Sequence, residues 1–304
     1  NTDIYFNGSS SLRWASNIFR NEQNEESDLS WTISPGLEVN LGRGISNADF
    51  TVITRYDIVR YEDNDRLDTE LFRIEALGTY ESSRLNLNGS ASFDEIKMND
   101  GQKNVVNDLV ELDKTAGELD AEYRVSPKFS FSAGVRYDET EYQTFKNLFS
   151  DRATTAYPLS VYYDLTPKLD LILGYTYSVT DIEGSNSFGG AFDPISSYEQ
   201  DTDFFNIGLR GNISTKLTGF FKIGYRTVSA GDTNLTNGGV PVRRIDRNDR
   251  DMLGLDVSLT WMATSKLLYR LALSRDYNTG GLGEATEVNR ANLVGNYSFN
   301  THWS

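Results

Sequence analysis

Apolar and polar residues alternate along almost the whole chain, and this alternation restricts the fold more than any other feature. Residues 126–142 read SPKFSFSAGVRYDETEY, in which Phe, Phe, Ala, Val and Tyr alternate with Ser, Ser, Gly, Arg and Asp. Successive side chains of an extended strand point to opposite faces, so this segment predicts a strand with one apolar face and one polar, charged face. Related segments open with the same kind of turn at 166–178, 214–226 and 264–276.

The alternation predicts fourteen strands of roughly 12–16 residues, whereas strands of globular proteins average about 5–6 residues. A strand tilted across a bilayer needs about 9–11 residues in the apolar layer. The length of the expected strands is therefore typical of strands that cross a membrane. The expected strands are residues 3–18, 29–42, 48–62, 69–82, 84–97, 114–125, 128–142, 153–165, 168–182, 202–214, 216–229, 250–263, 266–278 and 287–300.

The connections between these strands alternate between short and long. The short set consists of GRGISN, SSR, SPK, TPK, STK and TSK. The long set is more polar and consists of FRNEQNEES, MNDGQKNVVNDLVELD, QTFKNLFSDR, DIEGSNSFGGAFDPISSYEQ, SAGDTNLTNGGVPVRRIDRN and YNTGGLGEAT, with EDNDRLD as its one modest member. Short periplasmic turns and long extracellular loops are typical of outer-membrane barrels. No linker or shift in composition marks a second domain, so we expect residues 1–304 to form a single barrel domain.

The composition fits strands that have lipid on one side and water on the other. Hydrophobic residues make up 38% of the chain, and a mean hydropathy of −0.47 averages the two faces of each strand. A soluble sandwich, in which two sheets pack face to face, would not explain so long an apolar face and so uniformly polar an opposite face. No run of 18 or more residues is apolar, so we expect no membrane-spanning helix. Because only helices and closed barrels satisfy their backbone groups in lipid, we expect an all-β, transmembrane, antiparallel up-and-down β-barrel.

Charge and cysteine content exclude other classes. The net charge is −15 and the pI is near 4.6, which argues against nucleic-acid binding because a phosphate backbone is bound through clustered Lys and Arg. The chain has no cysteine, so it uses neither disulfides nor thiol chemistry. Its first residues, NTDIYFNGSS, lack the basic start and apolar stretch of a signal peptide, and we take the chain as a mature form or a fragment.

Aromatic residues recur at both ends of the expected strands. Such positions predict two girdles at the membrane interfaces, although Tyr and Phe also favour strands in general. The candidates before short turns are Tyr80, Tyr123, Tyr163, Trp261 and Phe299, and the candidates near long loops are Tyr61, Tyr137, Tyr177 and Tyr277.

Charged residues on the polar faces are candidates for the lining of a pore. Mixed charges would hydrate a lumen and offer hydrogen bonds to sugar hydroxyls, and ladders of opposite charge would also stabilise the wall itself. The candidates are Arg55, Asp57, Arg73, Glu75, Glu118, Asp120, Glu122, Arg124, Arg136, Asp138, Arg210, Lys222, Arg226, Asp256 and Arg270. Three acids of ELDAEYR share one face, and a charged pore wall is favoured there over a pair of catalytic carboxylates.

The last expected strand runs into THWS, which resembles the openings of the other short turns. Bacterial single-chain barrels have an even number of strands. We therefore expect at least fourteen strands in this chain and 16 or 18 in the complete protein. The alternative is an ordinary 14-stranded barrel with a frayed tail.

Residues near the N-terminal end resemble a known family. Three pieces carry the resemblance: NIFR ahead of an acidic loop, SPGL in the second expected strand, and the pattern YxxNxxLD, formed here by Tyr61, Asn64, Leu67 and Asp68. They resemble a bacterial family of outer-membrane β-barrel porins that is often encoded with exopolysaccharide biosynthesis systems. The resemblance covers about the first hundred residues, and beyond them only the strand pattern matches. It implies an outer-membrane barrel with a role in polymer secretion, and it supplies no catalytic residues.

Few residues suit catalysis or metal binding. His302 is the only histidine, which excludes histidine triads and histidine metal sites. YEDNDRLDTE at 61–70 gathers oxygen ligands for a hard cation but lacks the glycine and terminal glutamate of an EF-hand, so a solvated acidic loop is favoured. NGGVPVRRIDRNDRD at 237–251 favours an ion-paired loop over a patch that meets lipopolysaccharide phosphates or an anionic polymer. We therefore expect no enzyme and no cofactor.

These features predict a passive pore in the outer membrane of a Gram-negative bacterium, in contact with the lipid bilayer and lipopolysaccharide. We expect a conduit in exopolysaccharide export, with polysaccharide and periplasmic export components as partners. One alternative is a general diffusion porin for small solutes, in which residues 181–200 fold inward and constrict the pore. Another is a structural or adhesive surface barrel with a plugged lumen.

Overall fold

Strands make up almost all of the structure. The computed structural model describes residues 2–19, 25–42, 47–98, 108–184, 197–245, 249–279 and 285–298. In this part of the chain, no helix is long and apolar enough to cross a membrane. One short 3-10 helix, η1 (Asp65–Leu67), follows β3. The strands are β1 (Thr2–Ala15), β2 (Asp28–Leu41), β3 (Ala48–Tyr61), β4 (Thr69–Glu81), β5 (Leu85–Met98), β6 (Val110–Arg124), β7 (Phe129–Tyr142), β8 (Arg152–Thr166), β9 (Leu169–Ile182), β10 (Tyr198–Asn212), β11 (Leu217–Ala230), β12 (Thr233–Asn237), β13 (Val240–Ile245), β14 (Arg250–Met262), β15 (Leu267–Thr279) and β16 (Ala285–Tyr297).

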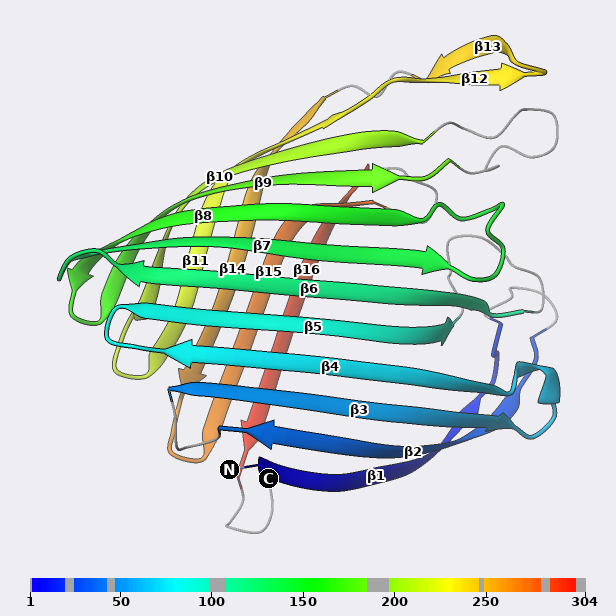
Figure 1. The fold of residues 1–304 in the computed structure, drawn as a ribbon, viewed down its shortest axis with the longest axis horizontal. Helices are drawn as coiled ribbons and strands as arrows, with labels where there is room; N and C mark the ends of the chain where they lie inside the picture. The colour runs from blue at the N-terminus through cyan, green and yellow to red at the C-terminus, as the bar shows by residue number, and fades with distance from the viewer. Residues whose placement is uncertain are drawn as a thin grey trace.

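Fourteen of the strands form one antiparallel sheet in which each strand pairs with its neighbours along the chain (Figure 1). The hairpin β12–β13 forms a separate two-stranded sheet, so β11 pairs directly with β14. The fourteen strands expected from the alternation are confirmed, and most of their ends agree to within a few residues. The hairpin was not expected.

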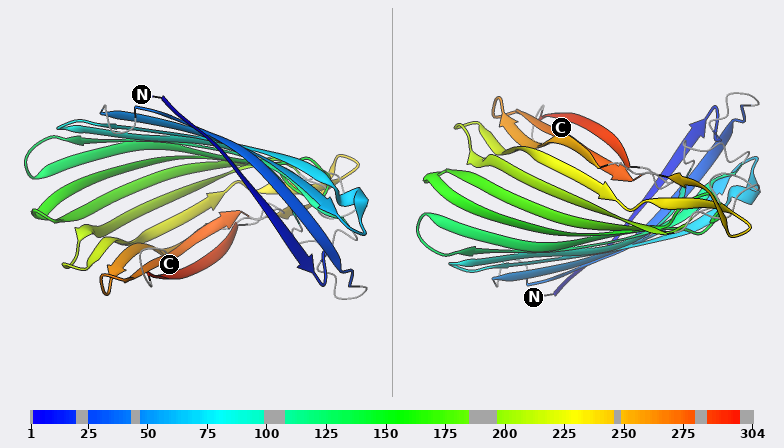
Figure 2. Two further views of the ribbon diagram at one scale, coloured as in Figure 1. Left: turned by 90° about the horizontal axis from the view of Figure 1, so that it is seen from below. Right: turned by 90° about the horizontal axis from the view of Figure 1, so that it is seen from above.

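The sheet is strongly curved, with one concave and one convex face (Figure 2). Its edges are β1 and β16, which form no hydrogen-bonded pair with each other within the described residues. An unpaired strand edge exposes N–H and C=O groups that lipid cannot satisfy. The fourteen strands are therefore a continuous stretch of barrel wall that is open between β1 and β16. The expected total of 16 or 18 strands stays a prediction.

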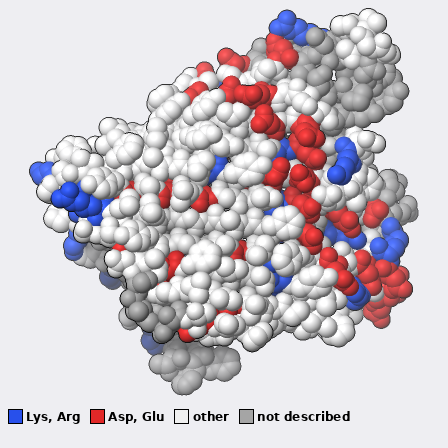
Figure 3. Space-filling model, in the orientation of Figure 1, with Lys and Arg blue, Asp and Glu red and all other residues white. Residues whose placement is uncertain are grey.

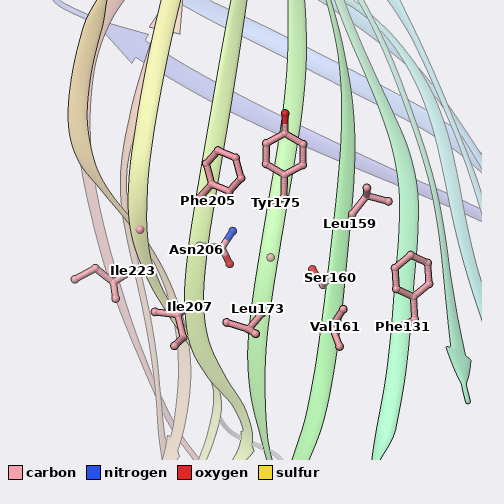
Figure 4. A pocket seen from close by; sticks show the side chains of 12 residues that line it. Phe131, Leu159, Ser160, Val161, Leu173, Tyr175, Phe205, Asn206, Ile207 and Ile223 are labelled. Carbon is pink, nitrogen blue, oxygen red and sulfur yellow. The ribbon is translucent and has the colours of Figure 1, made fainter. Parts of the chain in front are cut away.

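Large apolar side chains cover the convex face. Leu173, Phe205 and Ile207 have exposed fractions of 54%, 58% and 48%. Figure 4 shows these residues beside Val161 and Phe131 on neighbouring strands, where they line a shallow apolar groove. In a soluble protein so large an exposed apolar surface would cause aggregation, whereas in a membrane barrel it meets the acyl chains.

A repeated hydrogen-bond pattern shapes the short turns. In the turn between β6 and β7, the Ser126 hydroxyl accepts hydrogen bonds from the amides of Lys128 (3.3 Å) and Phe129 (3.1 Å). Ser214 accepts the equivalent bonds between β10 and β11. The side-chain oxygen thus satisfies amides that the ladder leaves free, which explains the recurring S/T-x-K sequence.

Candidate pore wall and its rims

The strand register places the fifteen pore-lining candidates on one face of the sheet. Residues directly opposite each other in an antiparallel pair lie on the same face. Arg73 lies opposite Asp94, and Lys222 lies opposite Asp256. A polar cavity of about 710 Å³ opens on this face, and its lining includes Asp120, Arg136, Asp138, Lys222, Arg226 and Asp256. The same alternation, carried from strand to strand, puts the remaining candidates on the concave side.

Most of these charges form ion pairs along the wall. The Arg136 Nε lies 2.9 Å from a Glu118 oxygen, and the Arg55 Nε lies 3.0 Å from an Asp57 oxygen. Arg226 has only 14% of its side chain exposed and lies 2.5 Å from Asp276. Three acidic partners were not among the candidates, although each follows the same alternation: Asp94, Asp170 and Asp276.

Arg210 connects four strands across the concave face. Its two terminal nitrogens donate to both oxygens of Glu122 on β6, at 2.7 and 2.6 Å, and its Nε donates to Asp170 on β9 at 2.9 Å. The guanidinium carbon also lies 3.4 Å from the centre of the Tyr162 ring on β8. Glu122 and Arg210 are 88 residues apart in the sequence, and only the curvature of the sheet brings them together.

At the long-loop rim, which comprises the strand ends joined by the long connections, the concave face becomes apolar. Val110 and Leu112 continue the side of β6 that carries the charged wall, and both pack against Tyr142 and Phe149. Residues 143–151 thus fold back onto the inner side of the rim, with the Tyr142 and Phe149 rings stacked 4.7 Å apart. The turn includes Phe145 at a φ of 56°, which is strained for a residue with a side chain. The apolar residues of QTFKNLFSDR were the available signal for this contact.

A second apolar cluster joins other loops at the same rim. Phe19, Leu67 and Leu109 are buried together, and Ile18 and Tyr61 pack against them. Tyr61 was a girdle candidate, and the structure places it on the concave side of β3, against this loop cluster. Residues 185–196, which hold most of the expected constriction loop 181–200, lie outside the described residues.

The Asp28 carboxylate holds the loop between β3 and β4 against the rim. It accepts hydrogen bonds from the Asn64 side chain (2.9 Å) and from the amides of Leu29, Asp63 and Asn64. Burial acts to raise the pKa of Asp28, but these hydrogen bonds outweigh it and leave the pKa below its ordinary value of 3.8. These hydrogen bonds therefore stabilise the folded rim when the pH is above the ordinary pKa of 3.8. The stabilisation is lost as the pH falls through the pKa that Asp28 has in the folded protein.

Replacing Asp28 with alanine should increase hydrogen exchange in residues 62–68 by about 10- to 100-fold at neutral pH, because buried amides lose a charged acceptor worth about 1–3 kcal/mol. Hydrogen exchange of the full-length protein in bilayers, measured on its peptides, tests this increase. Asp49→Ala, at the opposite end of β3, is the matched control and should leave residues 62–68 unchanged. In the unmodified protein, protection of this loop should fall below about pH 4. Unchanged exchange in Asp28→Ala would contradict the role of the carboxylate.

The remaining aromatic candidates that the structure describes alternate onto the convex face near strand ends. Tyr80, Tyr123 and Trp261 are 38%, 44% and 48% exposed near the short turns. Tyr177 lies near the long loops, and its hydroxyl donates to Asp201 at 2.6 Å. Tyr163, Tyr137 and Tyr277 follow the same alternation, and Phe299 lies outside the described residues. Their role as membrane girdles stays a prediction.

The two rims differ in charge. Figure 3 shows acidic side chains in a band near the long-loop ends of the strands and Lys and Arg side chains at the short-turn end. Outward-facing acids of the band include Glu70, Asp201 and Asp203, which accept hydrogen bonds from the hydroxyls of Tyr56, Tyr177 and Tyr175. In the β12–β13 hairpin, Arg244 is ion-paired with Asp232. The described residues contain no group of three or more acidic or histidine side chains that could hold a metal ion.

Comparison with known families settles the class of the protein. Residues 37–304 match the family described as "Putative outer membrane beta-barrel porin, MtrB/PioB". The chain belongs to this family. The resemblance to outer-membrane porins is thus confirmed, and the MtrB/PioB match does not include the association with exopolysaccharide systems. The chain is an all-β, antiparallel transmembrane barrel protein, and MtrB/PioB membership places it in the outer membrane of a Gram-negative bacterium.

The chain is also similar to several solved structures. The open form of the ferric-catecholate import receptor Fiu from E. coli K12 is 10% identical, with a TM-score of 0.48, and the match covers 91% of this chain and 54% of Fiu. This MtrB/PioB chain therefore spans about half the length of that receptor. The TodX deltaS2S3 mutant, a monoaromatic hydrocarbon channel, is 10% identical with a TM-score of 0.40, and the match covers 97% of this chain and 88% of TodX. A Pseudomonas aeruginosa FadL homologue is 8% identical with a TM-score of 0.33, and the match covers 97% and 87%. No curated protein sequence matches the chain.

Proposed function

We propose that the chain forms the wall of a water-filled passage through which a hydrophilic solute or polymer crosses the outer membrane without an energy source. The observation that carries this proposal is the polar cavity of about 710 Å³ on the concave face, which contains basic and acidic side chains from β5 to β16. Paired charges of both signs keep a lumen hydrated and give it little preference for either ion sign. Membership of a porin family supports the same role.

An exported polysaccharide is the occupant that we propose for this passage. The cavity lining contains many uncharged polar side chains, including Ser132, Ser160, Ser178 and Asn206, together with the Tyr162 ring. Hydroxyl and amide groups exchange hydrogen bonds readily with sugar hydroxyls, so a polymer can move along the wall without binding tightly at one point. Periplasmic export components would supply the direction of transport. Some of the neighbouring charges are neutralised by ion pairs, as Arg136 is by Glu118 and Arg226 is by Asp276, which weakens the electrostatic hold of the wall on a polymer.

Planar-bilayer recordings of the full-length protein test both proposals. We expect an open conductance with weak ion selectivity, and we expect the organism's own polysaccharide to block it reversibly. Replacing Arg136 and Lys222 with glutamine should shift the reversal potential toward cations, because two basic groups of the wall are removed. Arg60→Gln is the matched control, because Arg60 lies on the convex face beside Glu70 and should not change selectivity.

The outcomes separate the candidates. Open conductance without a block by the polymer would leave a diffusion porin for small solutes. A sealed barrel would contradict the passage and favour a structural or adhesive surface protein.

A further inference from the structure

Every short turn that the structure describes between strands of the fourteen-stranded sheet has a basic residue directly before the next strand. A serine or threonine two positions earlier accepts backbone hydrogen bonds and fixes the turn, as Thr166 does for Lys168 at 3.3 Å and Thr264 does for Lys266 at 3.2 Å. The turn geometry therefore holds the basic residue at the same place in each hairpin. These residues form the short-turn rim and are Arg84, Lys128, Lys168, Lys216 and Lys266.

The basic groups of the short-turn rim lie at the surface of the protein. All five residues are exposed. Within the part of the chain that the structure describes, Arg84, Lys128 and Lys168 form no ion pair with an acidic side chain. The Lys216 ammonium donates to the Ala263 carbonyl at 3.1 Å, which leaves its charge uncompensated. This differs from the pore wall, where Arg136, Arg210 and Arg226 are all paired with acids.

Aromatic side chains lie beside these basic groups on the convex face. Trp261 is opposite Leu217 and Tyr269, so it lies between the turns that carry Lys216 and Lys266, and its ring is 5.7 Å from that of Tyr269. Near the turns that carry Lys128 and Lys168, the rings of Phe129 and Tyr163 lie 5.0 Å apart. Aromatic residues prefer the headgroup level of a bilayer, and basic residues just beyond them reach the phosphates.

We propose that the short-turn rim binds anionic phospholipid headgroups of the leaflet that surrounds it. The basic groups occur once per hairpin, about 10 Å apart, because each hairpin adds two strands with a spacing of about 4.8 Å. Single basic residues at regular intervals beside aromatic side chains suit the lipids that surround a barrel. An acidic protein partner would instead need a continuous basic patch. The outward acids of the opposite rim, including Asp201 and Asp203, repel the same headgroups and make the preference specific to one leaflet.

The tryptophans provide reporters for both rims. Trp261 lies at the short-turn rim, and Trp31 lies on β2 near the long-loop rim, where it is 49% exposed. Two forms of the full-length protein, each with only one of these tryptophans and phenylalanine at every other tryptophan position, are reconstituted in phosphatidylcholine vesicles. Brominated phosphatidylglycerol and brominated phosphatidylcholine are then compared as fluorescence quenchers.

At Trp261 the anionic lipid should bind more tightly than the neutral lipid by a factor on the order of five for each basic residue that contacts it. At Trp31 we expect no preference for the anionic lipid. Lys216→Gln with Lys266→Gln should abolish the preference at Trp261, and 1 M salt, with a Debye length of about 3 Å, should reduce it.

The variants must retain the circular dichroism and the heat-dependent gel mobility of the folded barrel, so that lost preference is not confused with lost folding. Equal quenching by both lipids at Trp261 would overturn the proposal. So would a preference that persists after both lysines are replaced, or an equal preference at Trp31.

Discussion

Val161→Arg should lower the free energy of unfolding by about 2–4 kcal/mol, which is the cost of a basic side chain near the bilayer midplane on the lipid face of a barrel. Val161 lies near the middle of β8, is 42% exposed, and pairs with Phe131 and Leu173 on the neighbouring strands. An arginine at this depth must either lose its hydration or draw water into the apolar layer. Urea titration of protein folded in lipid vesicles measures the change.

The adjacent residue is a matched control at almost the same depth. Ser160 alternates with Val161 along β8, so it belongs to the opposite face, and it lines the polar cavity. Ser160→Arg should change the unfolding free energy by about 0.5 kcal/mol or less, because its guanidinium enters water. Equal effects of the two substitutions would contradict the assignment of the convex face to lipid and the concave face to water.

Arg210→Gln should have the second large effect, a loss of about 3 kcal/mol in unfolding free energy. The Arg210, Glu122 and Asp170 side chains are only 29%, 27% and 23% exposed, so removal of the cation leaves two poorly hydrated carboxylates without a partner. Arg210→Lys should recover part of the loss, because an ammonium keeps the charge but cannot form the two parallel bonds to Glu122. The same urea titration measures all variants.

An exposed ion pair provides the comparison for Arg210. Arg60 lies 2.7 Å from Glu70 with 43% of its side chain exposed, and Arg60→Gln should cost about 0.5 kcal/mol. A double-mutant cycle with Glu122→Gln isolates the coupling, since the double variant should be less destabilised than the sum of the single ones. If Arg210→Gln and Arg60→Gln cost the same, Arg210 does not hold the curved wall together.

The alternation in the sequence was sufficient to predict the strands and their faces. The strand expected at 128–142 is observed as Phe129–Tyr142, because a period of two fixes which residues can share the apolar side. The β12–β13 hairpin was missed, although Asn237-Gly238-Gly239 is a turn signal and both glycines have positive φ, at 57° and 78°.

The contacts that depend on tertiary structure could not be predicted in the same way. The alternation assigns Arg210 and Glu122 to the polar face of their strands. Nothing in the neighbouring sequence indicates that the two side chains meet across β7, β8 and β9. The inward fold of residues 143–151 is similar, since it depends on Phe149 reaching Tyr142 and Val110. Period-two alternation assigns a side to each residue, but it does not specify how strongly the sheet curves or how a loop returns to it.

The pairing of each strand only with its neighbours along the chain also bears on how such walls change in size during evolution. Loss or duplication of one hairpin leaves all other registers intact and alters the circumference by two strand widths, about 10 Å. Each hairpin whose short turn the structure describes brings its own lipid face, its own polar face and its own capped turn. The width of the barrel can therefore change in steps of one hairpin. Each added hairpin carries its own polar side chains, so the chemistry of the lining is kept.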